Sequence, residues 1–440
     1  MQVWKFGGTS VGKPERMHSI ARLITSDGTR KIIVLSAVSG TTNSLLQIGE
    51  LIKNNKKKSY SAIEELHNVY REFIQKLFST LAGWEKGKAI IDSHFDFITS
   101  LADAPFGDKE AKELVAEGEL LSTQIFNTYL EEAGIRSVLL PALDFMKIDE
   151  DEEPVLDDTE IYLNKATKND FANVNIFITQ GYICRNPEGE TDNLKRGGSD
   201  YTASLIGAAI RATEVQIWTD IDGMHNNDPR IVKRTFPIRQ ISFDEAAELA
   251  YFGAKILHPT CIRPAQKYHI PVRLLNTMQP EAPGTLITDS SVDMDIKAIA
   301  AKDGITAIQI RSSRMLLAYG FLRKVFEIFE KYKTPVDMIV TSEVAVSLTI
   351  DNNYHLNSIK EELERFAMVD IDNDQTIICI VGDFTFNKNG IVAKALQELA
   401  DIPIRMVAYG GSEHNISVLI STEHKKLAMN LLNEGLFAFE

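Results

Sequence analysis

The sequence is poor in cysteine and contains no long apolar run. Its three cysteines, Cys184, Cys261 and Cys379, are scattered, and no two of them have the spacing of metal ligands. An odd, scattered set argues against a disulfide framework and fits a reducing cytosol. No 18 consecutive residues are apolar, and the first strand-like segment does not have the pattern of a signal peptide. We therefore expect a cytoplasmic protein with no membrane span, no signal peptide and no metal-ligand set of its own.

The chain also lacks an excess of positive charge. Lysine and arginine number 47 against 61 aspartates and glutamates, which gives a net charge of −14. This balance disfavours nucleic acids and anionic membranes as partners. The 440 residues, 44% of them hydrophobic, are enough for two to three domains with a large core.

The first dozen residues carry a lysine and a glycine pair at the end of an expected strand. Lys5 can place a positive charge on a transferring phosphoryl group, and Gly7 and Gly8 allow backbone N–H groups to approach it. The loop also fits P-loop spacing up to Lys13, but Pro14 stands where a hydroxyl must hold Mg²⁺. On this segment alone, a phosphate site and a simple strand-to-helix turn both remain open.

Apolar strand-like runs alternate with helical patterns through the first 290 residues, which predicts a mainly parallel sheet with helices on both faces. The expected strands are 31–36, 137–140, 174–179, 215–219 and 272–275. One helical stripe consists of Ile63, Leu66, Tyr70, Phe73, Leu77 and Leu81. Ligands bind beyond the carboxyl ends of such strands. Ser36, Gln180-Gly181 and Asp220 fall at those ends.

The last third of the chain contains an internal repeat. Gly320 and Gly390 each open a helix, which is followed by a proline and two strands, at an offset of 70 residues. Each unit has the β-α-β-β-α-β order of a ferredoxin-like fold. A tandem of this kind fits a regulatory or oligomerising module better than a continuation of the first sheet.

Two motifs could bind the charged ends of an amino acid. Arg196 can hold a carboxylate through two hydrogen bonds, beside the helix start at 197–199 and the carboxylate of Asp200. An ordinary helix N-cap with a surface arginine is the alternative. Glu119 lies in a helical run between a glycine and two leucines, so it needs a cationic partner if buried. That partner is either a substrate ammonium or a structural lysine.

A further strand end carries an acidic turn. Asp220 follows the strand 215–219 and Arg230 closes the loop, an arrangement suited to a nucleotide. The acids from 222 to 228 lack the alternation of a Ca²⁺ loop. Lys255, at an expected helix end, could face the same sheet edge or simply complement the helix dipole.

Taken together and in order, these motifs resemble those of aspartokinases, in the amino-acid kinase family. They are KFGGTSV (5–11), EGELLST (117–123), RGGSDYTA (196–203), WTDIDG (218–223) with DPR (228–230), and FGAKILHP (252–259). The repeat resembles the pair of ACT domains that such enzymes carry. The resemblance implies an α/β amino-acid kinase domain, with a mainly parallel sheet sandwiched by helices, at 1–290. Ferredoxin-like βαββαβ ACT domains would follow at 303–373 and 374–440, with 296–302 as a candidate strand of the second.

The resemblance also implies the reaction, in which Mg-ATP phosphorylates the side-chain carboxylate of L-aspartate to 4-phospho-L-aspartate, the entry to lysine, methionine and threonine synthesis. Catalytic roles would fall on Lys5, Asp200 and Lys255. The aspartate pocket would use Ser36, Thr42, Glu119 and Arg196. The nucleotide would contact Lys5, Gly7, Gly8, Thr9, Thr219, Asp220, Arg230 and Lys255, with His225 where similar enzymes place a tyrosine. The nucleotide phosphates, rather than side chains, would hold most of the Mg²⁺ coordination.

The first repeat resembles the lysine pocket of lysine-inhibited aspartokinases. The implied effector residues are Met315, Tyr319, Gly320, Phe321, Leu322, Asp337, Thr341, Ser342, Glu343 and Val344. Asp337 and Glu343 would pair with the ammonium groups of L-lysine, and L-threonine is the alternative effector. Similar enzymes pair their ACT domains across subunits, which implies a homodimer or a higher homo-oligomer.

Two other functions remain open. The chain could phosphorylate another acidic amino acid, such as N-acetylglutamate, although Glu119 and Arg196 fit a free ammonium and carboxylate. It could also be a non-catalytic amino-acid sensor, but the residues that argue against this are all present: Lys5, Arg196, Asp200 and Lys255.

Overall fold

The computed structural model describes residues 1–194, 197–253, 257–290, 294–312, 319–385 and 390–437. They form two compact units. Unit 1 contains Met1–Met224, Arg239–Phe243 and Leu257–Ser291, and unit 2 contains His225–Ile238, Asp244–Ile256 and Val292–Glu440. Two segments from before residue 290 therefore group with the C-terminal repeat.

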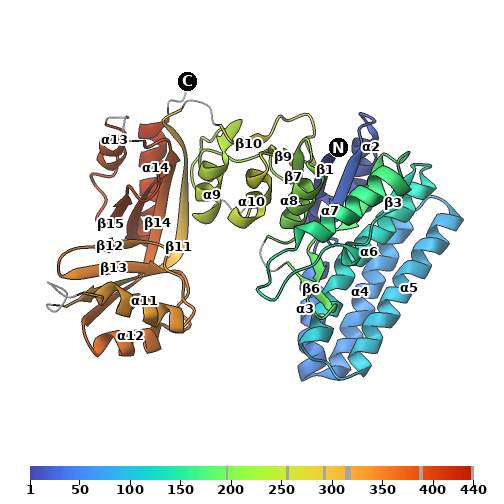
Figure 1. The fold of residues 1–440 in the computed structure, drawn as a ribbon, viewed down its shortest axis with the longest axis horizontal. Helices are drawn as coiled ribbons and strands as arrows, with labels where there is room; N and C mark the ends of the chain where they lie inside the picture. The colour runs from blue at the N-terminus through green and yellow to red at the C-terminus, as the bar shows by residue number, and fades with distance from the viewer. Residues whose placement is uncertain (195–196, 254–256, 291–293, 313–318, 386–389, 438–440) are drawn as a thin grey trace. The chain divides into compact units, whose positions relative to one another are not determined.

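Unit 1 is built on an eight-stranded sheet of order β3-β4-β2-β1-β7-β9-β10-β8 (Figure 1). The strands are β1 (Gln2–Phe6), β2 (Lys31–Leu35), β3 (Ser137–Leu139), β4 (Ile176–Gln180), β7 (Val215–Thr219), β8 (Gln240–Ser242), β9 (Val272–Asn276) and β10 (Thr285–Thr288). Neighbours from β3 to β9 are parallel, and β10 is antiparallel to β9. The predicted mainly parallel sheet is thus confirmed. A short hairpin of β5 (Ile183–Arg185) and β6 (Thr191–Asn193) stands apart.

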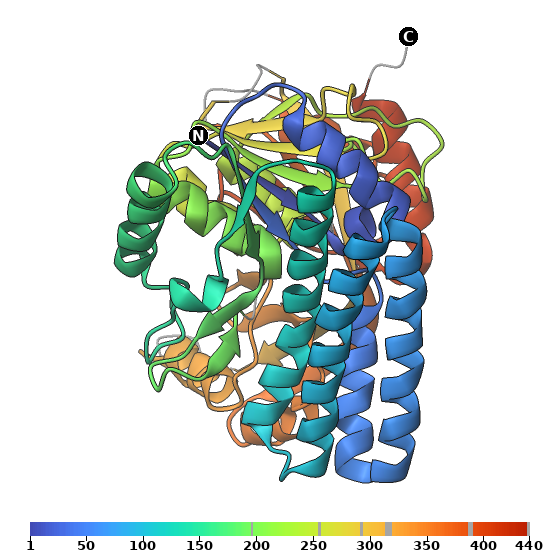
Figure 2. The ribbon, with the colours of Figure 1, turned by 90° about the vertical axis from the view of Figure 1, so that its right-hand side faces the viewer.

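Helices follow most of these strands. They are α1 (Gly8–Val11), α2 (Pro14–Thr25), α3 (Thr41–Asn54), α4 (Lys56–Leu77), α5 (Leu81–Asp103), α6 (Asp108–Glu132), α7 (Leu156–Lys165), α8 (Gly198–Ile210) and α10 (Pro259–Lys267), with short helical turns at Ala142–Asp144 and Ala166–Asp170. The long helices α3 to α6 run side by side (Figure 2). The expected stripe ending at Leu81 is wrong at its last residue. α4 ends at Leu77, and Leu81 opens α5 with 71% of its surface exposed, because Thr80 caps a new helix.

Alternation along β1 decides which side chains face which helices. Trp4 and Phe6 belong to the core shared with α2 to α6, together with Ile33 and Leu35 of β2. Successive strand residues point to opposite faces. Lys5 therefore lies on the other face, where α8 packs against β1.

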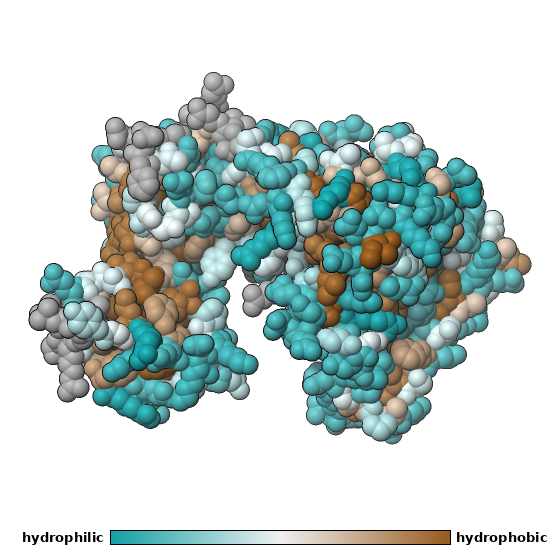
Figure 3. Space-filling view, in the orientation of Figure 1, coloured by the Kyte–Doolittle hydropathy of each residue, from teal (hydrophilic) through white to brown (hydrophobic). Residues whose placement is uncertain are grey.

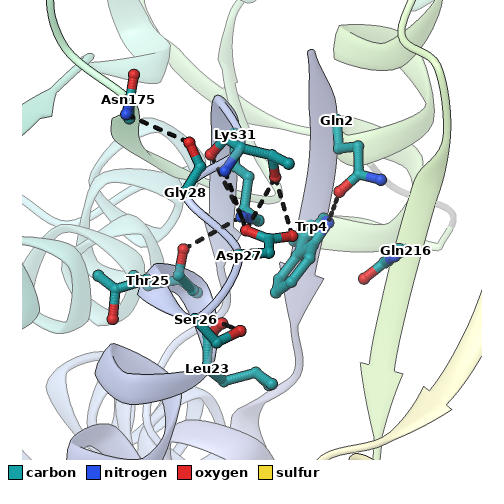
Figure 4. Close-up of polar contacts among 12 residues, drawn as sticks. Gln2, Trp4, Leu23, Thr25, Ser26, Asp27, Gly28, Lys31, Asn175 and Gln216 are labelled. Atoms are coloured by element: carbon teal, nitrogen blue, oxygen red, sulfur yellow. Dashed lines mark hydrogen bonds and ion pairs between the residues drawn. The ribbon is translucent and has the colours of Figure 1, made fainter.

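At the other end of β2, a lysine is held inside the fold. The Lys31 side chain is fully buried; its ammonium is paired with Asp27 and donates to the Ile24 carbonyl at 3.2 Å (Figure 4). It also lies 4.6 Å from the centre of the Trp4 ring. Burial raises the pKa of Asp27, but hydrogen bonds from Lys31 and Thr29 outweigh it and lower that pKa. The pair fixes the turn from α2 into β2.

Unit 2 contains a six-stranded antiparallel sheet of order β12-β13-β11-β14-β16-β15. Its strands are β11 (Ile296–Arg311), β12 (Ile339–Thr341), β13 (Ala345–Ile350), β14 (Met368–Gly382), β15 (Ile404–Tyr409) and β16 (Asn415–Ser421). Its helices are α9 (Phe243–Tyr251), α11 (Phe321–Lys331), α12 (Leu356–Glu364), α13 (Ile391–Gln397) and α14 (Lys425–Leu436), with a helical turn at Thr422–His424.

The two long strands are shared between the repeats. Residues 305–311 of β11 pair with 368–375 of β14 in the first repeat, and residues 296–302 pair with 377–382 in the second. The second repeat therefore takes one strand from a segment that precedes the first repeat in the chain. Each half keeps the ferredoxin-like strand arrangement.

The repeat also extends to backbone geometry. Gly320 and Gly390 cap α11 and α13 with φ of 81° and 84°. This left-handed conformation favours glycine. The 70-residue offset in the sequence thus relates two helix starts that have the same left-handed glycine cap.

The edges of the unit 2 sheet expose apolar side chains. Ile339 and Val340 of β12 and Ile404 and Tyr409 of β15 are each 37–46% exposed. Hydrophobic surface is visible where Figure 1 draws β12, β13 and β15 (Figure 3). Uncovered apolar edges of this kind commonly serve as contact surfaces.

Candidate active site

An ion pair between Lys5 and Asp200 forms the centre of the candidate site in unit 1. Lys5 Nζ lies 2.6 Å from Asp200 Oδ1, and the two side chains are 12% and 15% exposed. Lys5 comes from β1, and Asp200 from the first turn of α8. The pair neutralises both charges and fixes the lysine ammonium near the carboxyl end of β1.

Glycines are required where the chain leaves β1. A Cβ on Gly8 would lie 2.9 Å from the Ala37 carbonyl oxygen, and one on Gly7 would lie 3.3 Å from Lys5 Nζ. A side chain at Gly8 would collide with the Ala37 backbone and displace the loop, whereas one at Gly7 would crowd the flexible end of Lys5. The loop is held further by Arg16, whose guanidinium donates to the Thr9 carbonyl. Motif spacing alone did not indicate this role for Arg16.

Glu119 is buried beside the carboxyl end of β2. Its side chain is 4% exposed, and Oε1 accepts a hydrogen bond from the Ala37 N–H at 3.2 Å. Oε2 is also buried and has no hydrogen-bond partner among the described residues. Burial raises the pKa of Glu119 to about 7. A carboxylate in this state lacks a cation, which an ammonium group would supply.

Close packing of α6 against β2 explains the glycine before Glu119. A Cβ on Gly118 would lie 2.9 Å from the Cβ of Ala37. Only a glycine allows α6 to approach the strand end closely enough to bring Glu119 to the Ala37 N–H. The neighbouring Glu117 is paired with His94 and is not part of this site.

The ends of β2 and β4 meet the start of α8. Ser36 Oγ donates to Ser199 Oγ at 2.9 Å, and a Cβ on Gly181 would lie 2.3 Å from the Cβ of Ser199. The structure thus brings Ser36 and Gly181, at the ends of β2 and β4, together with the first turn of α8. Thr42 is half-buried in the first turn of α3. The contact between Ser36 and Ser199 was not anticipated.

The end of β7 carries the remaining unit 1 candidates. Thr219 accepts a backbone hydrogen bond from the Thr277 N–H at 2.8 Å, and Asp220 is exposed. His225 and Arg230 belong to unit 2. There His225 Nδ1 is 3.1 Å from Thr235 Oγ1. The Arg230 side chain is 80% exposed and makes a bidentate salt bridge with the carboxylate of Asp228.

Three predicted residues lie outside the described part of the chain: Arg196, Lys255 and Met315. Of the described effector candidates, Tyr319 is fully exposed, and Thr341, Ser342, Glu343 and Val344 are exposed in and after the edge strand β12. Asp337 differs from them because its side chain is only 2% exposed.

The comparisons with known proteins agree with this geometry. Residues 1–276 match the model of the amino acid kinase family, and residues 378–436 match an ACT domain. Aspartokinase 3, chloroplastic, of Arabidopsis thaliana is 36% identical over 462 residues, which cover 99% of this chain and 81% of that protein. The chain belongs to the aspartokinase family.

Further relatives support this assignment over the full length. Lysine-sensitive aspartokinase 3 of Escherichia coli is 32% identical and covers 99% of both chains. The solved structure of E. coli aspartokinase III in complex with aspartate and ADP, called the R-state, matches with a TM-score of 0.86 at 31% identity. The complex of that enzyme with lysine and aspartate, the T-state, matches with a TM-score of 0.81. Both matches cover 100% of each chain.

The expected enzyme class and fold are therefore confirmed. The chain is a kinase with an amino-acid kinase fold and C-terminal ACT domains. None of the helices in its described ranges combines the length and the apolarity needed to cross a bilayer.

Proposed function

We propose that this chain transfers the γ-phosphoryl group of ATP to the side-chain carboxylate of L-aspartate, giving 4-phospho-L-aspartate. The observation that carries the proposal is the buried, half-satisfied carboxylate of Glu119 at a strand end shared with Ser36. It supplies the anion that a free α-ammonium group requires. Arg196 would hold the α-carboxylate, which leaves the side-chain carboxylate to face the phosphate.

The reaction needs little proton transfer. The aspartate side chain is ionised at pH 7 and is itself the nucleophile, so no general base is required. The barrier arises because an anion must approach a triphosphate. The Lys5 ammonium offsets this repulsion most strongly in the transition state, where the negative charge is shared between the attacking and leaving oxygens.

Asp200 would keep that ammonium in position before substrates bind. A preorganised charge costs no reorganisation during the reaction, whereas a mobile surface lysine would have to be ordered first. The 2.6 Å contact with Asp200 restricts Lys5 in this way. Lys255 would add a second cation from the segment that follows α9.

The loop that follows β1 suits the phosphate groups of a nucleotide. Gly7 keeps the space beside Lys5 Nζ free of a side chain, so phosphate oxygens could reach the lysine there. The Gly7 N–H donates to the Trp218 carbonyl, so the N–H groups offered to a phosphate would be those at the start of α1. Thr9, Thr219 and Asp220 would complete the nucleotide site within unit 1, and the resemblance adds His225 and Arg230, which belong to unit 2. The described residues contain no cluster of three or more His, Cys, Asp or Glu that could hold a metal ion. As the resemblance implies, Mg²⁺ would be held mainly by the nucleotide phosphates, where it would neutralise part of their charge.

ADP release tests this proposal directly. We expect release in the presence of L-aspartate and a 4-phospho-L-aspartate product that hydroxylamine traps. L-glutamate and N-acetylglutamate serve as controls, because the latter has no free ammonium group for Glu119. Faster turnover of N-acetylglutamate than of L-aspartate would contradict the assigned substrate, and no turnover of any of the three would favour an amino-acid sensor.

We also propose that L-lysine inhibits the enzyme through the first ACT repeat, as expected of a first step in lysine, methionine and threonine synthesis. The match to the lysine complex of the E. coli enzyme supports this proposal. Asp337 is the buried acid that an effector ammonium would approach. Activity measured with and without millimolar L-lysine, with L-threonine in parallel, identifies the effector.

The exposed apolar edge of β12 supports a proposal of self-association. Ile339 and Val340 expose hydrophobic side chains on β12, whose outer edge pairs with no other described strand. A second copy of the chain would cover it and form a homodimer. Light scattering coupled to gel filtration should give about twice the chain mass of 49.2 kDa, or a higher multiple.

A further inference from the structure

Two side chains from separate elements of unit 2, Tyr251 and Lys302, meet at Asp337. Asp337 Oδ1 accepts a hydrogen bond from the Tyr251 hydroxyl at 2.7 Å and lies 2.8 Å from Lys302 Nζ. Lys302 Nζ is also 2.8 Å from Asp351 Oδ2 and 4.5 Å from the centre of the Tyr251 ring. One ammonium is thus shared between two carboxylates and an aromatic face.

The cluster connects three elements of secondary structure. Tyr251 is the last residue of α9, and Asp337 leads into β12 of the first repeat. Lys302 lies in the part of β11 that pairs with β14 in the second repeat, opposite Ile377. The cluster therefore joins a helix encoded within the kinase motifs to both ACT repeats.

The second oxygen of Asp337 remains available. Oδ2 is buried and has no hydrogen-bond partner among the described residues. A buried carboxylate oxygen without a donor is unfavourable, so a group that donates to it would be bound with little competition. Beside it lies a cavity of about 550 Å³, whose lining includes Glu248, Tyr251, Asp337, Met338 and Tyr409.

We propose that Tyr251 and Lys302 position Asp337 and couple effector binding in the ACT repeats to α9. This inference rests on the proposed inhibition by an amino acid with a primary ammonium group. An ammonium that approaches Oδ2 brings a second positive charge close to Lys302. Lys302 can withdraw toward Asp351, which is 37% exposed and already within 2.8 Å.

That displacement would change α9. Tyr251 loses the cation from its ring and shares Asp337 with a new donor, so the end of the helix is held less firmly. Lys255 follows Tyr251 by four residues in the chain. In the sequence, the end of α9 directly precedes the motif 252–259, which carries this lysine proposed above for the nucleotide. Couplings of this kind typically amount to about 5- to 150-fold in affinity.

The test separates binding of the effector from its consequence. Tyr251→Phe keeps the ring but removes the hydroxyl that donates to Asp337. We expect kcat without L-lysine to stay within about twofold, and the calorimetric Kd for L-lysine to stay within about threefold. The L-lysine concentration for half inhibition should rise at least about tenfold, within the usual range of allosteric coupling.

Lys302→Met provides a second, independent variant. Removing the internal ammonium takes away the competitor for Asp337, so L-lysine should bind more tightly while inhibition weakens. Tyr354→Phe is the matched control, because Tyr354 is 85% exposed in the same repeat and its hydroxyl should not matter. That control should show wild-type binding and inhibition.

Each outcome decides between the proposals. Wild-type enzyme that neither binds L-lysine nor responds to it overturns the proposed effector and this coupling together. Normal wild-type inhibition with an unchanged half-inhibitory concentration in Tyr251→Phe overturns the coupling alone. Loss of L-lysine binding in Tyr251→Phe, or weaker binding in Lys302→Met, would also overturn it.

Discussion

Lys5 Nζ lies 2.6 Å from Asp200 Oδ1, so the end of β1 is joined to the first turn of α8 by an ion pair. The two residues are 195 positions apart in the chain and belong to two different motifs of the family. The pair places a cation where a phosphoryl group would be transferred, and an anion that limits its motion.

Removing the Lys5 ammonium should abolish most of the catalytic rate. Lys5→Ala is expected to lower kcat by at least about 10²-fold, the usual loss when one preorganised charge stabiliser is removed. The effect should fall on kcat more than on the KM for aspartate, because the repulsion is greatest in the transition state. Steady-state kinetics with a coupled ADP assay measures both parameters.

Lys13→Ala is the matched control for this substitution. Lys13 is exposed in the same loop and occupies the lysine position of a P-loop pattern. It should retain kcat within about twofold. A large loss in Lys13→Ala with little change in Lys5→Ala would show that the phosphate is held by a P-loop after all.

The KM for aspartate should depend on pH through Glu119. With a pKa raised to about 7 by burial, Glu119 is mostly protonated at pH 6 and mostly ionised at pH 8. Because the ionised form binds the substrate ammonium, the KM for aspartate should fall about tenfold between these values, as the ionised fraction rises from about a tenth to about nine tenths. The KM for ATP, measured over the same range, serves as the internal control.

The same residue should make stability depend on pH. The folded chain holds a proton on Glu119 up to about pH 7, whereas the unfolded chain releases it near the ordinary glutamate pKa of 4.5. The free energy of unfolding should therefore fall as pH rises through this window. Glu119→Gln should flatten both this trend and the KM profile. Unchanged profiles in Glu119→Gln would assign the pH dependence to another group.

Much of this site could be predicted because its residues stand at the ends of strands. Lys5, Ser36 and Asp220 follow apolar runs that the sequence marks clearly, and parallel strands bring such ends to one edge. Gly320 and Gly390 revealed the repeat for a similar reason, since both occupy the same left-handed cap. Features of this kind depend on residues that are neighbours in the sequence, so the sequence alone is enough to predict them.

Contacts between distant segments were harder to predict. Nothing in the spacing of Tyr251, Lys302 and Asp337 indicates that they meet, because their approach depends on how α9 packs within unit 2. The role of Arg16 depends in the same way on a turn that brings its guanidinium to the Thr9 carbonyl. The sequence leaves open whether Glu119 is buried, because it does not show how closely α6 approaches β2.

The close approach of α6 to β2 can be tested by substituting two glycines in helices of unit 1. Gly118→Ala places a methyl group 2.9 Å from the Cβ of Ala37, so α6 must move away from β2. We expect an unfolding free energy lower by about 1–3 kcal/mol and a raised KM for aspartate, since Glu119 moves with the helix. Gly49→Ala is the control, because its nearest contact would be an ordinary 3.5 Å to Leu114. It should be neutral or stabilising.

The ion pair between Lys297 and Glu245 should be the most sensitive charge in unit 2. Lys297 Nζ lies 2.9 Å and 3.0 Å from the two carboxylate oxygens, and the side chains are 2% and 1% exposed. Lys297→Met leaves the Glu245 carboxylate buried without this ammonium and should lower the unfolding free energy by about 3–5 kcal/mol. Lys297→Met combined with Glu245→Gln should recover much of the loss, because no buried charge remains.

Lys360→Met, which breaks an exposed pair with Glu364 on α12, should cost less than about 1 kcal/mol in the same urea titration. Equal losses in Lys297→Met and Lys360→Met would mean that water reaches the pair and that it does not anchor α9 to β11.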